Sequence, residues 1–225
     1  MLFWLLAAFF SGSLMFSYWL GLLAERDVRQ VGDGNPGAIN LWKAAGAKLG
    51  VLGVVLDFSK GYVPVLAAMS AGHRDGHELA LIAAAPVFGH IFSPFLKFRG
   101  GKGIAVTFGV WSALTAFRAS LALAVTLLIL HVVFRKIGSW KVAPSDVDGF
   151  EVALGVMLLP GYLVTADYPA GILMFWLLNF LLILYAHRHP VTNVLRQWLF
   201  DAERDDAWMA EQPEEEKERG KSIGG

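Results

Sequence analysis

The sequence of 225 residues contains no cysteine, and its formal net charge at neutral pH is zero. The absence of cysteine excludes disulfides and thiolate metal sites. The balanced charge gives no indication of a nucleic-acid partner or of acidic substrates. Charged residues make up only 17% of the chain and hydrophobic residues 56%, more than in an ordinary soluble domain. This composition points to a membrane protein.

The hydrophobic residues form long runs, several of which approach the roughly 20 residues that cross a bilayer. No basic region precedes the first run, which favours a retained span over a cleaved signal peptide. We expect an all-α polytopic integral membrane protein with about seven transmembrane helices. They are placed at residues 2–24, 49–69, 79–96, 103–116, 119–134, 150–166 and 169–186.

The fourth and fifth spans are separated on physical grounds. One helix from Gly103 to Phe134 would be about 48 Å long, which exceeds the thickness of a bilayer. It would also place Arg118 in hydrocarbon, at a high cost in free energy. Two antiparallel helices that turn near Arg118 avoid both problems. Counts of five or six spans remain open.

Orientation follows from the positions of Lys and Arg, which are enriched in cytoplasmic loops. Basic residues gather after the first, third, fifth and seventh spans: Arg26, Arg29, Lys43, Lys48, Lys97, Arg99, Lys102, Arg135, Lys136, Lys141, Arg188 and Arg196. The opposite connections contain only Arg74 and Arg118. The N-terminus is therefore expected outside and the C-terminus in the cytoplasm. Residues 1–200 form the transmembrane domain, and residues 201–225, with nine acids and four bases, are expected to be a charged, largely disordered cytoplasmic tail.

A glycine-rich segment, VGDGNPGAIN, follows the first span on the predicted cytoplasmic face. Gly32, Gly34 and Gly37 leave the backbone N–H groups uncovered, and converging amides can bind an anion. Asn35 and Asn40 add side-chain amides. A flexible loop that only joins two spans is an equally good interpretation of this stretch alone.

A second glycine-rich segment follows the third span. Gly100, Gly101 and Gly103 surround Lys102 directly before a predicted helix. Backbone amides, the positive end of that helix and an ammonium group favour a phosphate ligand. The spacing is not that of a Walker A loop. The alternative is a basic turn that reflects only the positive-inside bias.

Ionisable residues within the spans, and polar residues after the last one, add candidates. Asp57 and Lys60 share a helix face, where they form either part of a functional site or a structural ion pair. His90 is either a ligand or a hydrogen-bonded core histidine. After the last span, His187, Arg188, Asn193 and Arg196 offer a base, a guanidinium fork and an amide donor. A basic cap at the membrane edge explains this last group equally well.

These segments resemble the bacterial acyl-phosphate:glycerol-3-phosphate acyltransferase family (the PlsY family). Its patterns GSGNxGATNxxR, LDxxKG, GHxFPxxxxFxGGKGxAT and HRxNIxR correspond in order to GDGNPGAIN, LDFSKG, GHIFSPFLKFRGGKGIAV and the HR pair at 187–188. The resemblance covers roughly residues 5–200. The family's serine, first threonine and arginine are Asp33, Ile39 and Lys43 here, its threonine after GGKG is Val106, and four residues separate HR from Asn193. Ser139 corresponds to a serine-bearing loop of the family.

The resemblance implies transfer of a fatty acyl group from acyl phosphate to the 1-hydroxyl of sn-glycerol 3-phosphate, which yields lysophosphatidate and phosphate. Lys102, His187 and Asn193 are the implied catalytic residues. The implied substrate-binding residues are Gly32, Asp33, Gly34, Asn35, Gly37, Asn40, Lys43, Lys60, His90, Gly100, Gly101, Gly103, Ser139 and Arg188. The partners are the two substrates and membrane lipids, the location is the bacterial inner membrane with the site facing the cytoplasm, and no cofactor, metal or nucleic acid is implied.

Other functions also remain open. The HxxxxD pair of acyl-CoA-type acyltransferases is absent. A catalytically degenerate relative that binds a lipid or phosphate is one alternative, and a small anion transporter is another. Asp33 bears on this choice, because a carboxylate in a phosphate pocket repels the substrate. We expect its side chain to point away from the pocket and to form a turn or helix cap.

Overall fold

The computed structural model describes residues 1–138 and 140–211, and every regular element within them is a helix. The elements are α1 (Leu2–Ser13), α2 (Phe16–Leu23), η1 (Val28–Gln30), α3 (Ala38–Ala45), α4 (Ala47–Ser70), α5 (Gly76–Ile91), η2 (Pro94–Leu96), α6 (Ile104–Thr115), α7 (Arg118–Ile137), α8 (Pro144–Thr165), α9 (Ala170–Ala186) and α10 (Arg188–Glu211). The all-α prediction is confirmed.

Each of the seven predicted spans coincides with helical structure, but they are not equally long. Five segments are long and apolar enough to cross a membrane, and a sixth is added if α9 and α10, which are bent by 73°, count as one span. The predicted fourth span is α6, whose 12 residues reach only about 18 Å. By length and composition, the described chain therefore has five or six candidate spans instead of seven.

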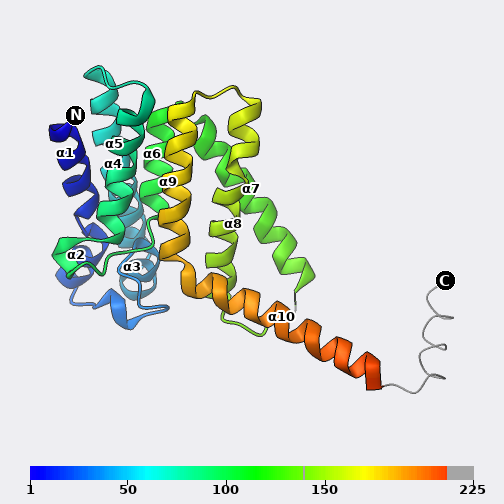
Figure 1. The fold of residues 1–225 in the computed structure, drawn as a ribbon. Coiled ribbons are helices and arrows are strands. Elements are labelled where there is room, and N and C mark those ends of the chain that lie inside the picture. Colours follow the sequence, from blue (N-terminus) through cyan, green and yellow to red (C-terminus); the bar gives the residue numbers. More distant parts are fainter. Residues whose placement is uncertain (139, 212–225) are drawn as a thin grey trace.

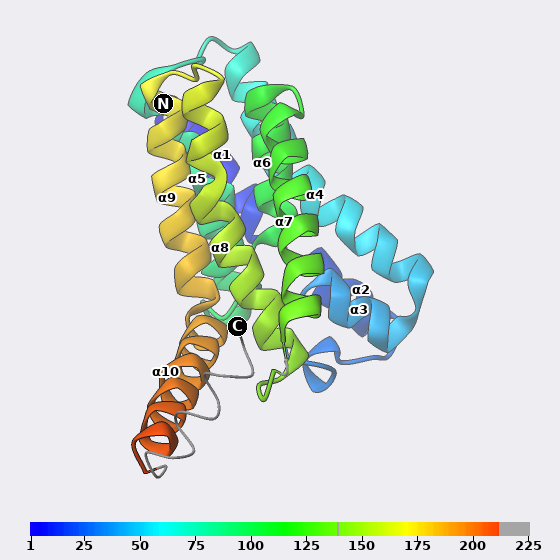
Figure 2. The same cartoon turned by 90° about the vertical axis from the view of Figure 1, so that its right-hand side faces the viewer.

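Most of the long helices run side by side (Figures 1 and 2), whereas α4 slants away from them toward α3 (Figure 2). The N-terminus and the α4–α5 and α8–α9 connections lie at one end of this bundle, whereas α2, α3 and α10 lie at the other end. Neighbouring helices pack in the pairs α4–α6, α1–α5, α5–α9 and α7–α8. Both glycine-rich segments lie at the end of the bundle that carries α2 and α3 (Figure 1).

The core is aromatic and aliphatic, with a small polar centre. Trp111 of α6 and Phe175 of α9 are fully buried, and their ring centroids are 4.7 Å apart. The Trp111 indole donates to Asn179 Oδ1 over 3.2 Å, and the Asn179 amide donates to Thr107 over 3.0 Å. Large apolar side chains are exposed on the outer helices, for example Leu121 and Leu128 on α7. Such a surface suits a lipid environment.

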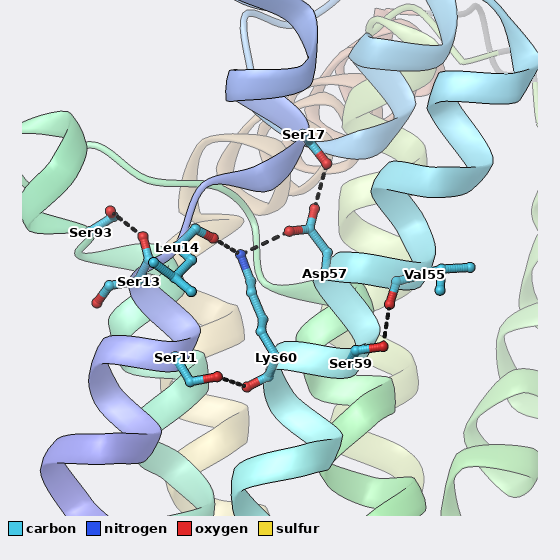
Figure 3. A network of polar contacts seen from close by, with 9 residues as sticks. All are labelled: Ser11, Ser13, Leu14, Ser17, Val55, Asp57, Ser59, Lys60 and Ser93. Carbon is cyan, nitrogen blue, oxygen red and sulfur yellow. Dashed lines mark hydrogen bonds and ion pairs between the residues drawn. The ribbon is translucent and has the colours of Figure 1, made fainter.

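The predicted first span is broken into α1 and α2 between Ser13 and Phe16. A helix break frees backbone carbonyls that must find other donors. The Ser93 hydroxyl donates to the Ser13 carbonyl over 2.7 Å, and the Lys60 ammonium donates to the Leu14 carbonyl (Figure 3). Side chains from α4 and from the α5–η2 connection therefore stabilise the break.

The C-terminal helix α10 runs from Arg188 to Glu211, so the predicted domain boundary at residue 200 falls inside one helix. Pro190 lies in its first turn, where a proline is compatible with a helix. The rest of the predicted tail, residues 212–225, lies outside the described residues.

Candidate active site

The first glycine-rich segment connects η1 to α3 and is organised around Asp33. Gly32 and Gly34 both have positive φ values, +61° and +73°, which glycine adopts at little cost. The Asp33 Oδ1 atom accepts from the backbone N–H of Asn35 over 3.1 Å and from the Asn40 side-chain amide over 2.8 Å. Asn40 also donates to the Asn35 carbonyl. The segment is therefore an ordered turn with a carboxylate held at its centre.

Lys43 reaches back over the same turn from α3. A Cβ built on Gly32 would lie 2.5 Å from Asn40 Oδ1 and 3.2 Å from Lys43 Nζ. The absence of a side chain at Gly32 thus lets an amide and an ammonium approach the backbone together. The structure brings Lys43 and Asn40 together beside Gly32.

The second glycine-rich segment packs on the end of α5. The N–H groups of Gly100 and Gly101 donate to the carbonyls of Ile91 and His90, both over 3.0 Å. A Cβ on Gly100 would lie 1.9 Å from the His90 carbonyl oxygen, and a Cβ on Gly101 would lie 2.3 Å from His90 Nε2. The loop therefore packs directly against His90, whose side chain is buried.

The two segments meet through one ion pair. The Lys102 ammonium lies 2.7 Å from Asp33 Oδ2, and the two side chains are 22% and 26% exposed. Burial raises the pKa of Asp33, but hydrogen bonding and charge from Lys102, together with the Asn35 and Asn40 hydrogen bonds, outweigh it and leave the pKa below its ordinary value. The prediction that Asp33 points away was wrong, because the carboxylate faces Lys102. It does form the predicted turn through Asn35.

His187 lies at the break between α9 and α10 and is fully buried. Its Nδ1 atom is 2.9 Å from the Ile183 carbonyl, which can only accept, so Nδ1 carries the proton. The lone pair is then on Nε2, which has no hydrogen-bond partner among the described residues. The charges of Lys102 and Asp33 both act electrostatically on His187.

Two predicted site residues after the last span have other partners. The Arg188 guanidinium stacks on the Tyr185 ring at 4.4 Å and donates to the Tyr185 carbonyl. The Asn193 amide donates to Asp146 Oδ2 of α8 over 2.9 Å. Neither contact involves the glycine-rich segments, so these two residues do not complete the site in this conformation. Ser139 lies outside the described residues.

Lys60 forms a structural ion pair, which is one of the two interpretations that the sequence left open. Its ammonium is 2.8 Å from Asp57 Oδ1 and also binds the Leu14 carbonyl, and the lysine side chain is 1% exposed (Figure 3). The Ser17 hydroxyl donates to the other Asp57 oxygen over 2.7 Å. A substrate phosphate has no access to Lys60 here, because protein groups surround the ammonium.

A His–Glu pair at the opposite end of the bundle has the spacing of the HxxxxD motif, which the sequence itself lacks. His73 is followed five positions later by Glu78, and His73 Nδ1 lies 3.1 Å from Glu78 Oε2. The spacing is that of HxxxxD with glutamate in place of aspartate. The pair flanks the α4–α5 connection, away from both glycine-rich segments (Figure 1).

Fold and site together define a multi-pass helical membrane protein whose two glycine-rich segments meet at the Lys102–Asp33 ion pair. The sequence profile of the glycerol-3-phosphate acyltransferase family matches residues 2–197. The chain is 36% identical over 194 residues to glycerol-3-phosphate acyltransferase 1 of Thermotoga maritima, which covers 84% of this chain and 94% of that protein. It is 34% identical to the enzyme of Aquifex aeolicus, with 86% and 95% covered.

Solved structures agree with the sequence comparison. The fold is similar to the crystal structure of PlsY (YgiH), an integral membrane glycerol 3-phosphate acyltransferase, in its glycerol 3-phosphate form. The TM-score is 0.75 at 31% identity, with 87% of this chain and 92% of that chain covered. The lysophosphatidic acid form gives a TM-score of 0.74. The chain belongs to the PlsY family of glycerol-3-phosphate acyltransferases, as the motif resemblance predicted.

Proposed function

We propose that the enzyme transfers a fatty acyl group from acyl phosphate to the 1-hydroxyl of sn-glycerol 3-phosphate. The observation that carries this proposal is the meeting of the two glycine-rich segments at Lys102 and Asp33. Each segment leads into the N-terminus of a helix, α3 or α6, and has a lysine beside it, so two phosphate groups can be held next to each other. Structures of a related enzyme in glycerol 3-phosphate and lysophosphatidic acid forms support the acceptor and the product.

The reaction needs little covalent help from the protein, because acyl phosphate is a mixed anhydride with a good leaving group. The acceptor hydroxyl oxygen forms a bond to the acyl carbon, and the bond from that carbon to the phosphate oxygen breaks. We assign the first segment, with Lys43, to one phosphate, and Lys102 with the N-terminus of α6 to the other. Positioning and charge stabilisation then supply the catalysis.

The hydroxyl proton requires an acceptor, and the buried His187 constrains the choice. Its Nε2 lone pair is enclosed by protein atoms, so a substrate hydroxyl does not reach it in this conformation. We therefore assign the proton to an oxygen of the donor phosphate, which leaves as inorganic phosphate. His187 acts instead as a positioning residue at the break between α9 and α10.

An assay on the purified protein tests the function. Palmitoyl phosphate and glycerol 3-phosphate together should yield phosphate and lysophosphatidate in equal amounts, and palmitoyl-CoA should not replace the donor. Phosphate release that is independent of glycerol 3-phosphate would indicate a phosphatase. The absence of any release by the folded protein would favour a phosphate-binding relative without acyltransfer activity.

We further propose that the site faces the cytoplasm of a bacterial cell and that the N-terminus is outside. The support is the gathering of Lys and Arg at the end of the bundle that carries the site. Single cysteines at Asp75 and Arg99, both exposed, report the two ends in this cysteine-free chain. An impermeant thiol reagent applied to intact cells should label position 75. Labelling of position 99 alone would reverse the orientation.

A further inference from the structure

A cluster of three potential metal ligands joins α7 to α8. One ligand atom each from His131, Asp148 and Glu151 lies within 4.8 Å of the others. His131 Nδ1 is 3.1 Å from Glu151 Oε2. Asp148 and Glu151 are three residues apart on α8, so both point from one face of that helix toward α7. None of the three residues belongs to the site described above.

The buried carboxylate of this cluster is only half satisfied. The Glu151 side chain is 6% exposed, and its Oε1 atom has no hydrogen-bond partner among the described residues. An unpartnered buried carboxylate oxygen carries a substantial desolvation cost. Because Oε1 and Oε2 share one carboxyl group, the unpartnered oxygen is adjacent to the atom that contacts His131. A cation at this position would satisfy it.

We propose that His131, Asp148 and Glu151 form a binding site for a divalent transition-metal ion of the Zn²⁺ class. One imidazole nitrogen and two carboxylate oxygens are a ligand set that zinc accepts, with water completing the coordination. The imidazole argues against Mg²⁺ and Ca²⁺, which prefer oxygen ligands. The ion would replace the proton that His131 shares with Glu151 and would join the two helices next to the α7–α8 connection.

The site is accessible to an ion, whereas a neighbouring positive charge opposes binding. His131 and Asp148 are 46% and 55% exposed, so an ion can enter from their side while Glu151 forms the closed side. Arg135 lies one turn from His131, and its guanidinium is 3.4 Å from Asp148 Oδ1. Metal binding would draw Asp148 away from Arg135 and would place the cation near a positive charge. Arg135 should therefore weaken the site.

Titration of the purified full-length protein with Zn²⁺, after removal of any affinity tag, tests the proposal independently of acyltransferase activity. We expect one equivalent to bind, and His131→Gln and Asp148→Asn should each weaken binding at least tenfold. The matched control is His73→Gln, because His73 forms a His–Glu pair of the same length that belongs to no cluster of three ligands among the described residues. That variant should bind Zn²⁺ as the wild type does.

A second variant makes the test specific. Arg135→Gln should tighten Zn²⁺ binding about three- to tenfold, because it removes a nearby cation and releases Asp148. Thermal unfolding without metal confirms that each variant is folded, and Asp148→Asn, at an exposed position, keeps the test valid if His131→Gln does not fold. No saturable binding, or equal binding by wild type and the cluster variants, would show that His131 and Glu151 form only an ion pair.

Discussion

The Lys102 ammonium is paired with the Asp33 carboxylate at 2.7 Å, although the two residues come from separate loops. Asn35 and Asn40 donate to the same carboxylate. Three kinds of donor that suit a substrate phosphate thus converge on an anion that belongs to the protein. The carboxylate and a substrate phosphate compete for Lys102, because both cannot hold the ammonium in the same geometry.

Replacing Asp33 by serine should retain or raise acyl transfer. The change removes like-charge repulsion, frees Lys102 and supplies a hydroxyl donor to a phosphate. We expect the KM for glycerol 3-phosphate to fall severalfold. The measurement is lysophosphatidate formation at subsaturating glycerol 3-phosphate, with wild type and variant side by side.

The control for this variant is Asp27→Ser. Asp27 pairs with Arg29 before the same loop and has no contact with Lys102 among its described interactions, so kinetics should not change. A collapse of activity in Asp33→Ser would instead show that the carboxylate has a positive role, such as binding a substrate hydroxyl.

The effect of Asp33 on the KM for glycerol 3-phosphate should not depend on pH near neutrality. Its pKa is lowered from 3.8 in the folded protein, so the carboxylate stays ionised at all higher pH values. Its stabilising contribution is complete above the unfolded pKa and is lost only as the pH falls through the lower folded pKa. The ratio of KM values for wild type and Asp33→Ser should therefore be constant between about pH 6 and pH 8. A ratio that converges toward one at pH 6 would contradict this assignment.

Lys102 should be the most important single cation of the site. Lys102→Ala removes the ammonium between the two segments and leaves Asp33 unpaired, so transfer should fall at least 100-fold, which corresponds to about 2.7 kcal/mol of transition-state stabilisation. The matched control is Lys97→Ala, an exposed lysine of the same connection. Near-normal product formation by a folded Lys102→Ala protein would end the assignment.

The sequence predicted features whose signals are local. Apolar runs located the helices, and glycines at residues 32–37 and 100–103 marked the two turns, because a positive φ or a close backbone approach requires glycine. It also predicted that Lys60 pairs with Asp57, since three residues on a helix bring the two side chains together. What it left open was whether this pair binds substrate or holds helices.

The sequence did not show features that depend on distant contacts. The break after Ser13 lies inside a uniformly apolar run, and the groups that stabilise it, Lys60 and Ser93, come from other helices. Asp33 was misjudged because its partner, Lys102, comes from a connection two spans later. The cluster of His131, Asp148 and Glu151 was missed because its ligands have no motif spacing and meet only when α7 packs on α8.

Lys60 should be required for stability and not for phosphate binding. Lys60→Met leaves Asp57 charged and buried and removes the donor to the Leu14 carbonyl, at a cost of about 3–5 kcal/mol in the free energy of unfolding. Thermal unfolding in detergent should show a clear fall in Tm. The neighbouring substitution Ser59→Ala, at a half-buried position whose hydroxyl donates to Val55 of the same helix, should leave Tm unchanged.

A double variant separates the two roles of Lys60. Asp57→Leu combined with Lys60→Met removes both buried charges and should recover most of the lost stability. A Lys60→Met protein with wild-type Tm and no acyl transfer would show that the ammonium acts on substrate instead.

His187 provides the last prediction, because its burial separates a positioning role from general base catalysis. The Nδ1–H group donates to the Ile183 carbonyl, and Nε2 is buried without a hydrogen-bond partner among the described residues. Removal of a general base typically costs 10²- to 10⁴-fold in rate. Glutamine preserves much of the shape and a donor for the Ile183 carbonyl, so His187→Gln should lose less than tenfold in kcat. His187→Ala should lose more, because the packing against Gly149 is removed.

The measurement that checks the His187 variants is the initial rate of lysophosphatidate formation with both substrates saturating, alongside thermal unfolding of each variant. A loss above 100-fold in a His187→Gln protein with wild-type Tm would show that the imidazole itself takes the proton, and the assignment of that proton to the donor phosphate would then be wrong.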